Sequence, residues 1–149
     1  MADGSLKDKV LGRLIVQKVN LTNAQIKALR ATPATLVPAP KNGRLQFEFA
    51  RLKLNYAGTN AFTETADNLA VRYTDGSGAI VSQAIETTGF IDQTANTETN
   101  ALPKIDAIVT TANSVGKPLV LHNTGDGEIA GNAGADNTMK IWVGYRILA

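Results

Sequence analysis

The sequence almost lacks the side chains that perform most nucleophilic, general-base and metal chemistry. Its 149 residues include no cysteine and a single histidine, His122. Without cysteine there are no disulfides and no thiolate ligands, and one imidazole cannot supply the several histidines of a typical jelly-roll metalloenzyme. We therefore expect no metal, no cofactor and no catalytic residues, and a structural or binding role rather than that of an enzyme.

Long apolar runs and a strong charge of one sign are missing as well. The chain has 15 Lys and Arg against 13 Asp and Glu, a formal net charge of +2. Acidic or apolar residues interrupt each basic group, so we expect no direct binding of nucleic acid. The longest early apolar run, Leu14 to Val16, is too short for a signal peptide or a membrane span. These patterns predict no membrane association and fit synthesis in a reducing cytoplasm.

Most of the chain shows the alternation of apolar and polar residues that is typical of strands with one buried face. The apolar face reverses between Phe49 and Leu52, which predicts a bulge or bend near Ala50 and Arg51. The Thr- and Asn-rich stretch from Gln93 to Asn100 is expected to be an exposed loop. The strands are expected at residues 14–19, 45–56, 69–73, 79–85, 104–110, 118–122 and 139–147.

One short helix is expected directly after the first strand. Thr22 stands three residues before Gln25, the spacing of a capping box, and Leu21 can pack against Ile26. The helix should run from Asn23 to about residue 30, because Pro33 prevents much continuation.

Turn signals separate the strands, at residues 42–43, 75–76 and 126–127. Short strands at this spacing, without regular alternation with helices, predict an all-β fold, an antiparallel β-sandwich or jelly roll with one short N-terminal helix. Residues 13–149 form a single domain in this interpretation. Residues 1–12 form a flexible N-terminal arm, either a frayed terminus or a segment that becomes ordered against a neighbouring subunit.

Trp142 is the aromatic residue with the clearest functional interpretation. It lies opposite the apolar positions of the last strand, between Lys140 and Arg146, and should therefore face outward. Such a tryptophan is a contact for another subunit or a stacking platform for a sugar; the alternative is burial under a loop of its own domain.

Several short segments resemble the capsid decoration, or cement, proteins of tailed bacteriophages, and the resemblance extends from about Val19 to the C-terminus. The first and longest of these segments begins at Leu21 and ends at Leu29. The others are Thr32-Pro33, Leu36-Val37-Pro38-Ala39-Pro40, Gly43, Tyr56-Ala57-Gly58-Thr59, Val71-Arg72-Tyr73-Thr74 and Phe90-Ile91-Asp92-Gln93-Thr94.

The resemblance implies a jelly-roll-like structural virion protein, commonly a homotrimer, whose partner is the major capsid protein. Such a trimer binds the outer surface of the phage head and stabilises contacts between capsomers. We predict subunit or capsid contacts at Leu6, Lys7, Lys9, Val10, Trp142 and Arg146. The alternative is a carbohydrate-binding β-sandwich module of a phage tail or fibre, with Trp142 or Tyr145 as the stacking surface.

Overall fold

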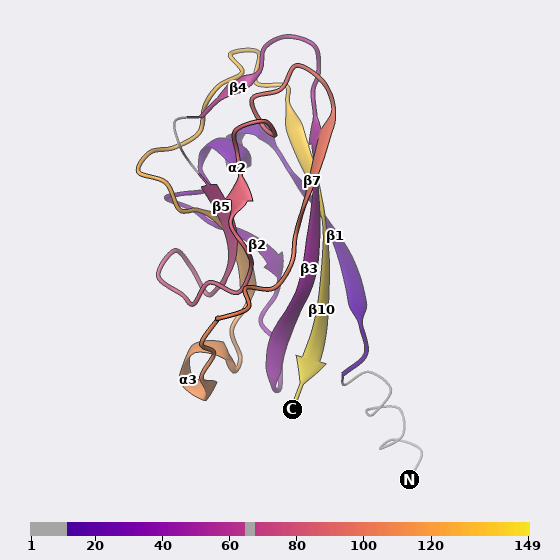
Figure 1. Cartoon of the computed structure of the whole chain (residues 1–149), viewed down its shortest axis with the longest axis vertical. Helices are drawn as coiled ribbons and strands as arrows, with labels where there is room; N and C mark the ends of the chain where they lie inside the picture. Colours follow the sequence, from indigo (N-terminus) through magenta and orange to yellow (C-terminus); the bar gives the residue numbers. More distant parts are fainter. Residues whose placement is uncertain (1–11, 65–67) are drawn as a thin grey trace.

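Two four-stranded antiparallel sheets face each other across an apolar core (Figure 1). The computed structural model describes residues 12–64 and 68–149. The first sheet has the order β1-β10-β3-β7 and the second the order β2-β8-β5-β6, while β4 and β9 form a separate pair. This arrangement is an antiparallel β-sandwich, as the sequence predicts.

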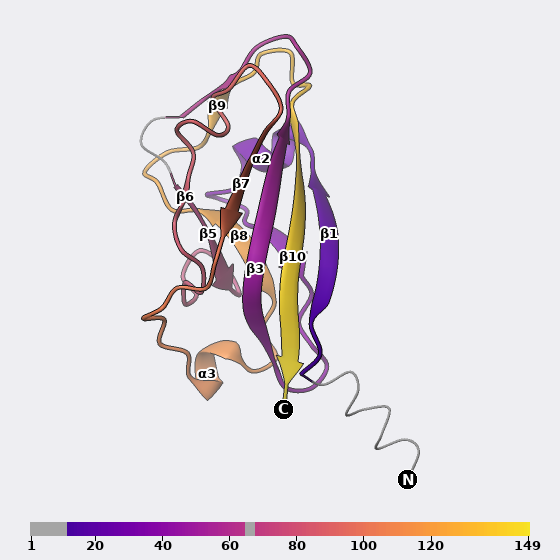
Figure 2. The ribbon, with the colours of Figure 1, turned by 45° about the vertical axis from the view of Figure 1, so that its right-hand side comes forward.

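The two sheets, the separate strand pair and the helices have the following bounds. The first sheet contains β1 (Ile15–Leu21), β10 (Thr138–Leu148), β3 (Arg44–Asn55) and β7 (Thr97–Ala101). The second contains β2 (Ala34–Val37), β8 (Leu119–Asn123), β5 (Asn68–Tyr73) and β6 (Ile85–Glu86). The remaining elements are β4 (Phe62–Thr63), β9 (Ala130–Gly131) and the helices α2 (Asn23–Lys27) and α3 (Thr111–Ser114). Figure 2 shows β3 and β10 side by side along the length of the molecule, with β1 at the edge.

Aliphatic side chains from both sheets fill the space between them. Leu52 and Ile141 of the first sheet, and Val71 and Leu121 of the second, have no exposed surface. Each such side chain contributes about 1.5–3 kcal/mol relative to an exposed one. The core therefore holds the first sheet in place and leaves its other face available to solvent.

The predicted reversal of the apolar face along β3 is present, but it lies earlier in the chain. Tyr145 pairs with Phe47 and Gly144 pairs with Phe49, so Glu48 is the extra residue of a bulge. Ala50 is consequently buried, and Phe49 lies on the same face as Arg51. Phe49 therefore faces away from the core.

Three other local predictions are wrong. Of the strand expected at residues 79–85, only Ile85 lies in a strand, β6, while Ile80 and Ser82 form isolated bridges. Residues 97–101 pair with β3 as strand β7 instead of forming a loop. The sequence pattern did not indicate this strand, because threonines, Thr97 and Thr99, occupy inward positions at which apolar residues are expected. Residues 104–110 form no strand; the chain turns there, and the amide of Ala107 donates to the carbonyl of Lys104.

The predicted helix α2 is confirmed, including its capping box. The Thr22 amide donates to Gln25 Oε1 at 2.9 Å, and the Gln25 amide donates to Thr22 Oγ1 at 3.3 Å. The helix ends at Lys27, three residues before the predicted end, and turns follow up to Pro33. Thr110 and Asn113 cap α3 in the same way. Of the helices described, none is both long and apolar enough to cross a membrane.

Candidate functional site

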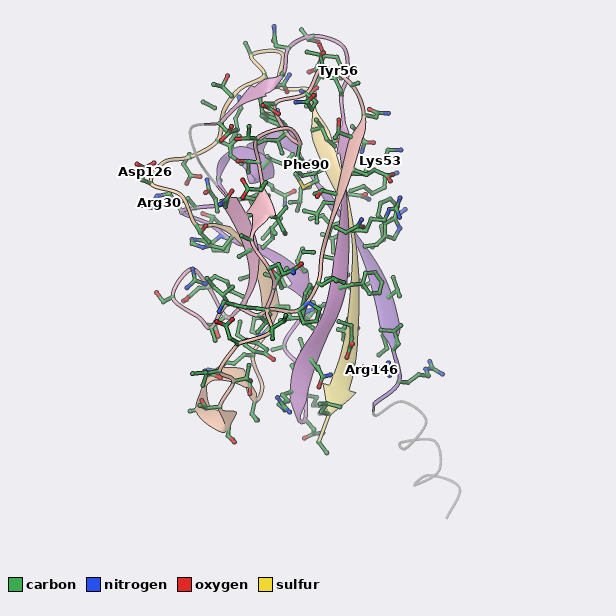
Figure 3. All side chains as sticks on the ribbon, in the orientation of Figure 1. Arg30, Lys53, Tyr56, Phe90, Asp126 and Arg146 are labelled. Atoms are coloured by element: carbon green, nitrogen blue, oxygen red, sulfur yellow. The ribbon has the colours of Figure 1, made fainter. Side chains whose placement is uncertain are left out.

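The outer face of the first sheet, meaning the side that points away from the second sheet, gathers cationic and aromatic side chains. The strand register places them in rows across the sheet, because β-strand side chains alternate between the two faces. Figure 3 shows Lys53 projecting from this side of the sheet. We call this surface the basic face; it consists of Lys18, Phe49, Arg51, Lys53, Lys140, Trp142 and the neighbouring Glu98.

Two lysines lie directly opposite each other in one row of the basic face. Lys140 of β10 pairs with Lys53 of β3, and Glu98 is the next residue across. The carboxylate of Glu98 forms its ion pair with Arg51 instead. Among the described residues, no salt bridge involves either lysine or Lys18. Directly opposed like charges disfavour strand pairing, so this row keeps a repulsion that an anion placed over it would relieve.

Trp142 occupies the centre of the next row. Lys18 of β1 is its partner on one side and Arg51 of β3 its partner on the other. Trp142 is partly exposed, whereas its chain neighbours Ile141 and Val143 are fully buried. Trp142 therefore faces outward, as predicted, and its neighbours across the strands are the cationic residues Lys18 and Arg51.

A third row adds apolar surface beside Trp142. Val16, which is 52% exposed, pairs with Gly144, and Gly144 pairs with Phe49. A Cβ atom on Gly144 would lie 2.1 Å from Phe49 Cε1, so the phenyl ring rests on the glycine backbone. The basic face thus combines charged rows with an adjoining apolar row.

Arg146, the other predicted contact on the last strand, is held within the chain. Its Nε donates to Glu48 Oε1 at 3.2 Å and its Nη1 donates to the Gly12 carbonyl at 2.6 Å. The Gly12 amide in turn donates to the Ile147 carbonyl at 2.8 Å. Arg146 therefore anchors the beginning of the described chain. The other predicted contacts, Leu6, Lys7, Lys9 and Val10, lie outside the described residues.

The segment from Leu102 to Val115, which contains α3, exposes several large aliphatic side chains. Ile105 is 98% and Ile108 81% exposed, and Leu102 and Val115 are also exposed. We call these four residues the apolar end. Sequence reasoning missed this surface, because it placed residues 104–110 in a strand, where alternate residues would be covered.

His122 is packed into the second sheet. It is 7% exposed on β8, and the Arg72 guanidinium donates to its Nδ1 at 3.2 Å, which requires a neutral ring. A Cβ atom on Gly76 would lie 2.7 Å from Nε2, so the glycine packs closely against the imidazole. Burial, and then the charge of Arg72, lower the pKa of His122. The imidazole is therefore hydrogen-bonded within its own domain.

Buried asparagines join the loops at the opposite end. Asn132 Oδ1 accepts from Asn23 Nδ2 at 2.6 Å and from the Asn137 amide at 2.8 Å. Its Nδ2 donates to the Asn60 carbonyl at 2.8 Å. Asn132 has a φ of 44°, a backbone conformation that asparagine tolerates better than most residues. These hydrogen bonds therefore connect the glycine-rich segment that contains Asn132 to the first residue of α2.

An open groove of about 480 Å³ lies where the edge strands β1 and β2 meet α2. Among its lining residues are Val19, Leu21, Ala28 and Pro33, and none of the lining residues is titratable. The groove therefore offers neither a general acid nor a general base. Residues 12–64 and 68–149 contain no group of three or more His, Asp or Glu side chains placed to hold a metal ion.

No protein-family model and no curated protein matches the chain. Among solved structures, the capsid of Ralstonia phage GP4 is similar at 15% identity and a TM-score of 0.44, covering 93% of this chain and 86% of that chain. Nora virus is similar at 9% identity and a TM-score of 0.38, covering 90% and 55%. Black queen cell virus is similar at 11% and 0.32, covering 95% and 71%. Similarity of this degree assigns neither a family nor a function to the chain.

Proposed function

We propose that the protein is a structural virion protein that decorates the outer surface of a phage head as a homotrimer. In this function it binds the major capsid protein, bridges neighbouring capsomers and catalyses no reaction. Several contacts made at once by one trimer raise its effective concentration at the shell, so each contact can be modest.

The apolar end is the observation that carries the proposal. Ile105 and Ile108 leave nearly all of their side-chain surface in water, and both lie in the same short segment of the chain. Clustered exposed aliphatic side chains mark surfaces that become covered in an assembly. Interfaces between copies of one chain are more apolar than transient ones, so we assign the apolar end to contacts within the trimer.

The sequence resemblance supports the same function. Its segments include the capped turn at Thr22, the strand containing Val71 and the segment after Phe90, which the structure places in different parts of one sandwich. The resemblance therefore concerns the whole domain. Leu6, Lys7, Lys9 and Val10 of the arm remain proposed contacts with a neighbouring subunit or the shell.

A carbohydrate-binding module of a tail or fibre is the second candidate. The partly exposed Trp142 favours it, because an indole on a sheet face can stack on a sugar ring. Lys18 and Arg51 on both sides of the indole suit an anionic partner better than a neutral sugar.

Copy number on the particle distinguishes the two functions. We expect purified particles of the virus that encodes the chain to carry several hundred copies on the head, measured by quantitative gel densitometry and image reconstruction. The isolated protein should have a mass three times the 15.7 kDa of one chain in light scattering. Only a few copies, located at the tail, would refute decoration and support the carbohydrate-binding function.

A further inference from the structure

We propose that the basic face is a docking surface for an acidic protein partner. The inference rests on the proposed function, because it identifies the face that the trimer turns toward the shell and the chemistry that the shell must present there. The partner is expected to place carboxylates over Lys53 and Lys140 and an apolar side chain against Trp142.

The charges of the basic face are the first argument. It carries Lys18, Arg51, Lys53 and Lys140, and its own carboxylate, that of Glu98, is engaged by Arg51. The neighbouring carboxylate of Glu48 is paired with Arg146. The remaining three ammonium groups have no salt bridge among the described residues. The whole chain has a net charge of only +2, so this positive charge is local to one face. A local surplus of positive charge complements a local acidic surface on a partner. Such complementarity raises the rate and the specificity of association.

The position of Trp142 is the second argument. Tryptophan is enriched at the centres of protein interfaces, where surrounding residues exclude water from it. Lys18 and Arg51 flank the indole across the strands, and the apolar row of Val16 and Phe49 follows immediately. This order of charged, aromatic and apolar rows fits a folded protein surface.

The same chemistry fits nucleic acid less well. Single-stranded nucleic acid binds along continuous basic tracks on which successive bases stack. Here Glu98 lies beside Lys53 and Glu48 lies beside Phe49, so a chain of phosphates crossing the face would approach two carboxylates. Discrete carboxylates of a protein can avoid these positions.

The test uses the intact chain and the fluorescence of Trp142, which is the only tryptophan and therefore reports from the face itself. Poly-L-glutamate serves as the acidic polypeptide, and oligothymidylate with the same number of charges is the comparison. We expect poly-L-glutamate to change the emission of Trp142 saturably. The affinity should fall about ten-fold between 50 and 300 mM NaCl, because the contacts are exposed charges.

Two matched variants locate the binding. Lys53→Glu/Lys140→Glu should weaken poly-L-glutamate binding at least about ten-fold, as expected when contacts between complementary charges become repulsive. Lys41→Glu/Lys117→Glu changes the net charge equally at residues outside the basic face, and should leave the affinity within about two-fold, since screening limits long-range effects. Circular dichroism and thermal melting confirm that both variants are folded.

Three results would overturn the proposal. These are equal weakening by the two double variants, absence of any change in Trp142 emission with poly-L-glutamate, and oligothymidylate binding as tight as poly-L-glutamate. The last result would assign the face to nucleic acid. Failure here is separable from failure of the proposed function, because copy number on the particle and trimer mass are measured without poly-L-glutamate.

Discussion

At the scale of single residues, the environment of His122 shows how the only imidazole of the chain is used. The ring packs closely against Gly76 and accepts a hydrogen bond from Arg72, and this hydrogen bond requires the ring to remain neutral. A protonated ring would place a second positive charge beside the guanidinium. His122 therefore links the stability of the second sheet to pH.

We expect the protein to lose stability as the pH falls below about 6.5, the ordinary pKa of histidine. The folded state holds the pKa of His122 lower than the unfolded chain does, so the unfolded chain binds the proton first and is favoured. Above this pH both states are neutral and the full stability is present.

Urea denaturation between pH 8 and pH 5 measures this effect. One group contributes a slope of at most about 1.4 kcal/mol per pH unit. The variant His122→Asn retains an acceptor for Arg72 but has no titrating group at this position. The free energy of unfolding of the wild type should therefore fall more steeply than that of the variant between pH 8 and pH 5, and the difference between the two should become smaller. A constant difference across this range would contradict the linkage.

At the scale of elements, the pairing of β3 with β10 determines which side chains reach the basic face. The bulge at Glu48 turns Phe49 outward, and Gly144 provides the space in which its ring lies. A glycine inside a strand ordinarily weakens it, since it has no side chain to pack. Here the ring of Phe49 packs over the backbone of Gly144 and shields it from solvent.

Gly144→Ala should therefore be destabilising only while Phe49 is present. We expect a cost of about 1–3 kcal/mol in the wild type, because the added methyl group displaces the ring. In the Phe49→Ala background the same substitution should be neutral or stabilising by about 0.5–1 kcal/mol, since alanine is less costly to order than glycine.

A double-mutant cycle measured by chemical denaturation gives the coupling directly. We expect a coupling free energy of at least about 1 kcal/mol between the two positions, as found for residues in contact. Equal costs of Gly144→Ala in both backgrounds would show that the ring does not determine the effect.

At the scale of the whole molecule, the sandwich presents two surfaces of different chemistry. The apolar end lies near α3 at one end of the molecule, and the basic face covers one side of the first sheet (Figures 1 and 3). An apolar surface suits permanent contact between copies, while a charged surface suits a separate partner. One domain can therefore form a trimer and bind a shell with different residues.

The apolar end can be tested by removing its side chains. Ile105→Ser/Ile108→Ser should convert the trimer to a monomer in light scattering. The free energy of unfolding of the monomer should change by less than about 0.5 kcal/mol per substitution, because both side chains are exposed. Leu14→Ser/Val16→Ser, at the exposed edge of β1, is the control and should leave the trimer intact. Dissociation in the control alone would assign the trimer contact to β1.

The sequence by itself determined the sandwich, the capped helix at Asn23 and the outward orientation of Trp142. These depend on local patterns: alternation with period two, a threonine three residues before a glutamine, and position on one strand. Tertiary pairing decided the rest. The exact site of the bulge, the recruitment of the polar segment 97–101 as a strand and the alignment of Lys53 with Lys140 depend on which strands are neighbours. The sequence also does not determine that Ile105 is exposed. Whether an aliphatic side chain is buried depends on which other parts of the folded chain pack against it.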